Sequence, residues 1–181
     1  MQVFRKLIHF ACILTSAIFV TGCVGVPKGI EPVKGFELDR YLGKWYEIAR
    51  LDHSFERGLH QVTAEYSRRD DGGIMVKNRG FSVEEGKWKE ITGKAHPVRS
   101  KNIGYLKVSF FGPFYSAYVV FELDRADYRY AYVSGFSKSY LWFLSRTPTV
   151  DEEKMRSFVE TADRLGFDTS RLIRVKQDPQ Y

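Results

Sequence analysis

Few residues in this chain have the types and spacing that catalysis or metal binding requires. The sequence contains no G-x-S-x-G nucleophile elbow, no glycine-rich phosphate loop and no H-E-x-x-H zinc motif. His53, His60 and His96 are not spaced as a metal set, and no cysteine accompanies them. Glu47 is the one carboxylate in strand phase with Trp45, and we expect it to hydrogen-bond a basic residue or water rather than act as a base. The sequence therefore predicts no enzyme, no metal site and no cofactor.

The N-terminal residues have the pattern of a secretory signal. Arg5 and Lys6 precede an apolar run from Leu7 to Val20, which is short for a membrane span. The run ends in V-T-G-C, which resembles a bacterial lipobox. We therefore predict a signal peptide over residues 1–22 and lipidation of Cys23 as the first mature residue. An uncleaved anchor, or secretion with a free Cys23, is the alternative.

Cysteine and charge usage restrict the class of protein further. Cys12 would leave with the signal, so Cys23 would be the single cysteine of the mature chain, which then has no intrachain disulfide. The formal net charge of +6 becomes 6 − 2 = +4 without Arg5 and Lys6. Basic and acidic residues are interspersed, which is typical of a solvated surface with at most a weak attraction to anionic lipid headgroups. Nucleic acid is not indicated as a partner.

Beyond the signal, the chain divides into a tether and one domain. Residues 23–36 comprise the lipidated cysteine and a stretch in which Pro, Gly and Lys alternate without periodicity, which predicts a tether. Residues 37–181 form the domain. Eight strands are expected in it, over residues 43–51, 61–68, 74–81, 87–95, 105–110, 116–123, 128–134 and 140–146. Their spacing is typical of β-sandwiches and up-and-down barrels. The last three strands are apolar on both faces, so another element must cover their outer side.

A single amphipathic helix follows the strands and can provide that cover. Thr149 and Glu152 fit a capping box at its start, and Gly166 suits the position just after its end. Apolar residues recur at helical spacing between them. A short strand over residues 171–176 closes the domain. The predicted fold class is therefore all-β, with one C-terminal α-helix packed outside and a short final strand.

Three short motifs resemble the signatures of the lipocalin family. The first, Gly43-Lys44-Trp45-Tyr46, follows one expected helical turn. The second, Asp127-Tyr128, lies at the turn that joins the sixth and seventh strands, and the third, Arg146, ends the eighth strand. The resemblance covers about residues 36–175 and implies an eight-stranded antiparallel up-and-down barrel, closed at one end. It implies that Trp45 plugs the closed end with Arg146 over its indole, and that these motif residues are framework rather than ligand-binding groups. We expect the framework to comprise Gly43, Trp45, Asp127, Tyr128 and Arg146.

The lipobox in front adds a resemblance to the bacterial outer-membrane lipoprotein members of that family. This resemblance implies fatty acids or lysophospholipids as ligands, and Val24, which is not Asp, implies sorting to the outer membrane with the domain facing the periplasm. An eight-stranded barrel has room for one small ligand if side chains do not fill it. From strand alternation we expect the cavity to be lined by Ala49, Val62, Ala64, Tyr66, Ile74, Val76, Leu106, Val108, Phe110, Tyr118 and Trp142.

Aromatic residues are concentrated in the loops at the expected mouth of the barrel. The predicted rim comprises Phe55, Leu59, Phe111, Phe114 and Phe136. An apolar rim marks an interaction surface, and this one could gate a lipid cavity, form a homodimer face or dip into a bilayer. Basic groups beside it, Arg57, His53, His60 and Lys138, could meet a phosphate or carboxylate headgroup or simply be solvated.

The sequence predicts a membrane-anchored lipid-binding protein that stores or transports fatty acids or lysophospholipids in the bacterial envelope. The alternative is an envelope interaction protein whose rim binds a second copy or another partner, with a filled interior and no carrier role.

Overall fold

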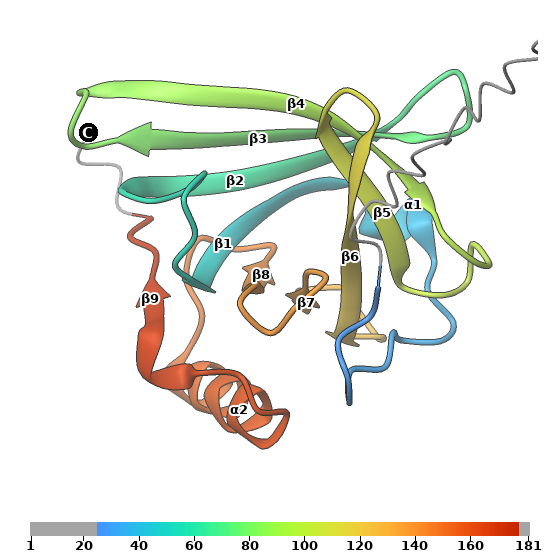
Figure 1. Ribbon diagram of the computed structural model, residues 1–181. Coiled ribbons are helices and arrows are strands. Elements are labelled where there is room, and N and C mark those ends of the chain that lie inside the picture. The colour runs from blue at the N-terminus through green and yellow to red at the C-terminus, as the bar shows by residue number, and fades with distance from the viewer. Residues whose placement is uncertain (1–24, 178–181) are drawn as a thin grey trace, which may run out of the picture.

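Eight antiparallel strands close into an up-and-down barrel in the computed structural model, which describes residues 25–177 (Figure 1). Each strand pairs with the next along the chain, and β1 pairs with both β2 and β8 to close the ring. This confirms the predicted fold class. The strands are β1 Gly43–Leu51, β2 Leu59–Arg68, β3 Ile74–Ser82, β4 Lys87–Pro97, β5 Tyr105–Phe111, β6 Phe114–Leu123, β7 Tyr130–Ser134 and β8 Leu141–Ser145.

The predicted signal peptide and Cys23 lie outside the described residues. The segment predicted as a tether is described from residue 25, and it is not free over its whole length. Ile30, Val33 and Phe36 are buried against the barrel. The backbone N–H of Val33 donates to the carbonyl of Val120 at 2.9 Å, and that of Phe36 donates to Asn102 at 2.8 Å. Within 25–177, no helix is long and apolar enough to cross a membrane.

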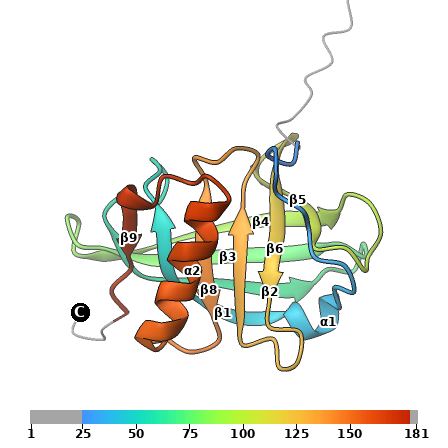
Figure 2. The ribbon, with the colours of Figure 1, turned by 90° about the horizontal axis from the view of Figure 1, so that it is seen from below.

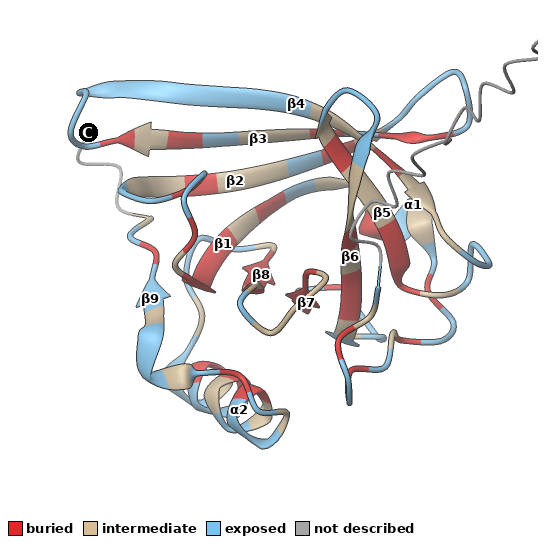
Figure 3. Cartoon of the chain, in the orientation of Figure 1, coloured by how far each residue is buried: buried red, intermediate tan, exposed pale blue. Residues whose placement is uncertain are grey.

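Helix α2 (Glu152–Arg164) covers the outer face of β7 and β8 (Figure 2). The ring of Phe158 lies 4.8 Å from that of Tyr132 and 4.9 Å from that of Phe143, measured between centroids. This contact explains why the strands beneath are apolar on both faces. Figure 3 shows the contrast with the far part of β4, whose residues are exposed.

The capping box predicted for this helix is wrong by two residues. The N-cap is Asp151 rather than Thr149, and its Oδ1 accepts a hydrogen bond from the N–H of Lys154 at 2.7 Å. Val150 and Met155 then occupy the positions of a hydrophobic staple, and both belong to the apolar cluster beneath the helix. Gly166, with φ of +78°, ends the helix as predicted.

The short final strand, β9 (Leu172–Arg174), lies outside the ring. It pairs with β1 where β1 separates from β2. Pairing between β1 and β2 stops at Tyr46 and Thr63, and β9 pairs with β1 beyond that point. The side-chain amide of Gln177 donates to the carbonyls of Glu47 and Val62, at 2.7 and 2.9 Å. The C-terminal segment thus joins the two strands where they diverge towards the mouth.

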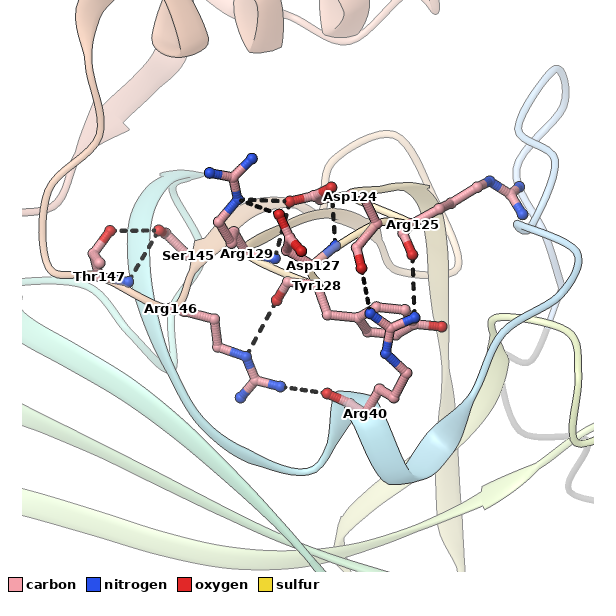
Figure 4. A network of polar contacts seen from close by, with 10 residues as sticks. Arg40, Asp124, Arg125, Asp127, Tyr128, Arg129, Ser145, Arg146 and Thr147 are labelled. Atoms are coloured by element: carbon pink, nitrogen blue, oxygen red, sulfur yellow. Dashed lines mark hydrogen bonds and ion pairs between the residues drawn. The ribbon is translucent and has the colours of Figure 1, made fainter.

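The closed end of the barrel is built around Trp45 and Arg146. The guanidinium carbon of Arg146 lies 3.9 Å from the centre of the Trp45 ring, and the indole N–H donates to the carbonyl of Tyr41 at 2.8 Å. Arg146 also donates to four backbone carbonyls, those of Arg40, Leu42, Lys44 and Tyr128. Figure 4 shows part of this network. One side chain therefore joins β8 to helix α1 (Leu38–Tyr41), to the start of β1 and to the β6–β7 turn.

The other framework residues shape the backbone at this end. Gly43 has φ of +91°, a conformation that residues with a Cβ rarely adopt, so the site favours glycine. Tyr128 has φ of +56°, and its hydroxyl accepts from the N–H of Glu37 at 2.9 Å. Asp127 lies in the same turn, where a carboxylate oxygen is 3.5 Å from Nε of Arg129.

Replacing Arg146 with Lys tests the importance of this network. Lysine keeps the charge but cannot reach several carbonyls in one plane, so some of the four carbonyls, two of them in part-buried hydrogen bonds, lose their donor. We expect Arg146→Lys to lower the free energy of unfolding by about 2–3 kcal/mol, measured by urea denaturation. Arg129→Lys is the matched control, because its side chain is 72% exposed and its ion pair contributes little. Equal unfolding midpoints for the two variants would contradict this prediction.

Candidate functional site

The barrel encloses an apolar cavity that opens at the end opposite Trp45. Its volume is about 810 Å³, within the range of small-molecule sites in proteins. Apolar side chains from β2, β3, β5, β6 and β8 form most of its wall. The interior is therefore hollow, whereas the alternative of an interaction protein without a carrier role expected a filled one.

Nine of the eleven residues predicted to line the cavity do so, namely Val62, Ala64, Tyr66, Val76, Leu106, Val108, Phe110, Tyr118 and Trp142. The predicted rim residues Phe55, Leu59, Phe111, Phe114 and Phe136 also line it. The remaining two predictions, Ala49 and Ile74, are wrong.

A β-bulge explains the error at Ala49. The register between β1 and β8 shifts between Glu47 and Ala49, so Ile48 is an extra residue on β1. Ala49 is consequently turned to the outer side, where it packs in the cluster beneath α2. Ile74 fails for a different reason. It is the first residue of β3, at the closed end, and it is buried in the packed base instead of the cavity wall.

Three tyrosines close the floor of the cavity. The hydroxyl of Tyr118 lies 2.7 Å from that of Tyr41 and 2.8 Å from that of Tyr66. Burial raises the pKa of all three phenols, so they remain neutral at physiological pH. The floor is thus polar only through groups that satisfy one another.

Two carboxyl groups lie in the cavity wall near the mouth, together with their partners. Arg50 donates to Oε1 of Glu47 at 2.6 Å, and its other terminal nitrogen donates to the carbonyl of Glu56 at 2.7 Å. Oε2 of Glu56 accepts from the Trp142 indole at 3.1 Å and lies 3.0 Å from Nε2 of His53. All these groups except Trp142 are buried. The contact with Arg50 confirms the expectation that Glu47 bonds a basic residue.

The pKa values of the two carboxyl groups in this cluster are shifted in opposite directions. Burial, and next the charge of Glu56, raise the pKa of Glu47 well above its usual value despite Arg50. Burial would also raise the pKa of Glu56, but the close contact and charge of His53, with Trp142 and Arg50, lower it overall. Glu56 is therefore ionised at neutral pH. Glu56 is not among the predicted cavity residues, because it lies in the β1–β2 loop, where no strand period indicates orientation.

Three of the five predicted rim residues are exposed, and two of their four predicted basic neighbours are engaged by other groups. Phe111 is 71% exposed, Phe114 60% and Phe55 57%, the highest values among the large apolar side chains of residues 25–177. Of the basic groups predicted beside them, Arg57 pairs with Asp52 at 2.8 Å and His53 is buried in the carboxyl cluster. In the same part of the chain, no set of three His, Cys, Asp or Glu side chains is placed to hold a metal.

Glu56→Gln tests the role of the ionised carboxylate. Since the pKa of Glu56 is lowered by folding, its charge stabilises the fold above its unfolded pKa of about 4.3, and this contribution is lost as the pH falls through the folded value. We expect the variant to be about 1–3 kcal/mol less stable at pH 7, with a difference that shrinks below about pH 4, measured by urea denaturation. Glu90→Gln, which removes an exposed pair with Lys77, is the control and should change little. A difference that grows on acidification would contradict the assignment.

Comparison with known proteins agrees with this geometry. Residues 36–177 match the family model described as a lipocalin-like domain. The chain is 60% identical over 91% of its length to the outer membrane lipoprotein Blc of Vibrio cholerae, of which it covers 96%. It is 48% identical over 95% of its length to the protein of that name in Escherichia coli K12, of which it covers 98%. Insecticyanin from the tobacco hornworm Manduca sexta has the same fold, with a TM-score of 0.68 and 22% identity, covering 86% of this chain and 88% of its own. The chain belongs to the lipocalin family, which implies the binding of a small hydrophobic molecule.

Proposed function

We propose that this lipocalin binds fatty acids or lysophospholipids and stores or transports them in the bacterial envelope. The observation that carries the proposal is the hollow interior, which is about 810 Å³ in volume and lined mainly by apolar side chains. An acyl chain placed there would contact apolar groups over most of its length, and its removal from water would drive binding.

The charges of the wall favour one orientation of such a ligand. Glu56 is ionised and Glu47 lies beside it, so a carboxylate or phosphate at that depth would have to compete with Glu47 for the charge of Arg50. Arg50, the cation of the cluster, already donates to Glu47 and to two backbone carbonyls. The acyl tail therefore lies deep, towards the tyrosine floor, and the polar end remains at the mouth.

We propose further that Cys23 is acylated and holds the domain on the periplasmic side of the outer membrane. The V-T-G-C sequence supports this, as does the name of the relatives from V. cholerae and E. coli, outer membrane lipoprotein. Several acyl chains on one residue make the attachment lasting, since a single chain binds only marginally. The intact mass of protein extracted from membranes tests the assignment. An acylated residue 23 at the N-terminus is expected, and an unmodified cysteine would contradict it.

Ala64→Phe tests binding in the cavity. Ala64 lines the deep part of the wall and pairs with Trp45, so a larger side chain there shortens the space for an acyl tail. We expect the affinity for an 18-carbon lysophospholipid or fatty acid to fall about tenfold or more, and that for a 10-carbon analogue to change much less. Displacement of an apolar fluorophore from the cavity measures both.

Glu65→Phe is the matched control for this experiment. Glu65 is the next residue on the same strand, but it is exposed and does not line the cavity. The proposal requires Glu65→Phe to bind all chain lengths as the wild-type protein does. Equal affinities for the three proteins at every chain length would place the ligand outside the barrel.

A further inference from the structure

The described chain begins at the open end of the barrel, close to the predicted anchor. Figure 2 shows residues 25–36 running from α1 along β5 and β6 to the end where the β5–β6 hairpin lies. Pro27 and Ile30 are buried, and the N–H of Val33 donates to the carbonyl of Val120 in β6 at 2.9 Å. From Pro27 onward, therefore, the segment is fixed to the barrel.

The distance from this fixed point to the anchor is short. Cys23 lies four residues before Pro27, and four residues span at most about 14 Å when fully extended. If the acyl chains of Cys23 lie in the bilayer, then Pro27 must remain within that distance of the membrane surface. A tether of this length restricts rotation of the domain relative to the membrane. It therefore holds the mouth, the end of the barrel where the tether is attached, towards the lipid.

The β5–β6 hairpin at this end presents an apolar tip. Phe111 and Phe114 face each other across the connection, and Gly112 and Pro113 between them are also exposed. No described side chain covers either ring, since they are 71% and 60% exposed. Aromatic side chains are enriched at the interface between lipid headgroups and acyl chains.

Basic side chains flank this tip. The ammonium groups of Lys94 and Lys107 lie 5.8 and 4.9 Å from the ring of Tyr115, the residue that follows Phe114. Lys28 is exposed in the turn that starts at Pro27. Cations beside an apolar tip suit a surface of phosphate headgroups over acyl chains. By contrast, the turns at the closed end contain mainly polar and charged residues, as in Arg69–Gly72 and Asp124–Asp127.

We propose that the mouth of the barrel rests on the membrane leaflet that holds the anchor, with Phe111 and Phe114 inserted at its interface. The inference depends on the proposed acylation of Cys23. Such a position places the cavity opening at the lipid surface, so a lipid can pass between leaflet and cavity without crossing free water. The occupant of the apolar tip is then the bilayer itself.

A fluorophore on the hairpin tests the position. After acylation the mature protein has no other free thiol, so Pro113→Cys can be labelled selectively with an environment-sensitive dye while both phenylalanines remain. Ala126→Cys, in the exposed turn at the closed end, is the matched control. Both lipidated proteins are reconstituted into vesicles of phosphatidylethanolamine and phosphatidylglycerol, with or without nitroxide-labelled lipid.

Quenching by the nitroxide lipid is expected to be several-fold greater for the dye at residue 113 than for the dye at 126. The double change Phe111→Ser and Phe114→Ser in the Pro113→Cys protein should reduce it, because the tip no longer inserts. Equal quenching at residues 113 and 126, or quenching unaffected by the double change, would overturn the proposal. So would a blue shift at residue 113 that occurs without vesicles and grows with protein concentration, since it would assign the tip to a second copy of the chain.

The same preparation separates this proposal from the proposed function. Intact mass reports whether Cys23 is acylated, and fluorophore displacement reports whether the cavity binds lipid. Normal acylation and lipid uptake with an unquenched hairpin would overturn the docked position alone. An acylated, quenched protein that takes up no lipid would instead overturn the carrier function and leave the docked position standing.

Discussion

The contact between Arg146 and Trp45 is the constraint on which the rest of the barrel depends. In an up-and-down barrel each strand is joined only to its neighbours, and neither end is closed unless other groups fill it. Here one guanidinium covers the indole and binds carbonyls from α1, the start of β1 and the β6–β7 turn. The closed end is thereby packed by its own residues and needs no contact with residues of the mouth. The opposite end can therefore remain open and hollow.

The cavity has an uncommon combination of groups, namely buried charged side chains beside an apolar wall. Burying charge beside an apolar cavity is costly unless each charge has partners, and the carboxyl cluster provides them through Arg50, His53 and Trp142. The same contacts hold the β1–β2 loop to the wall, since Glu56 belongs to that loop while Trp142 belongs to β8. The shape of the mouth and the electrostatics of the cavity are thus set by one group of side chains.

Much of this architecture could be predicted from the sequence, because its signals are local. Alternating apolar residues indicated the strands, and the resemblance of Gly43, Trp45 and Arg146 to the lipocalin motifs implied the closed end. The errors arose where tertiary structure changes a local pattern. The bulge at Ile48 turns Ala49 outwards, and no periodicity announces it. Asp151 takes the N-cap from Thr149 because the helix must place Val150 and Met155 against the barrel. Glu56 could not be predicted as a cavity residue, since loops have no period, and the buried turns of residues 27–36 have a composition typical of a linker.

The proposed function makes one physical requirement, which is that the hollow interior accommodates an acyl chain. Native mass spectrometry of the protein extracted from its own membranes tests this most directly. One bound lipid per chain, released on collisional activation and identified as a fatty acid or lysophospholipid, is the expected result. A bare protein that also takes up neither class of lipid when they are added would contradict it.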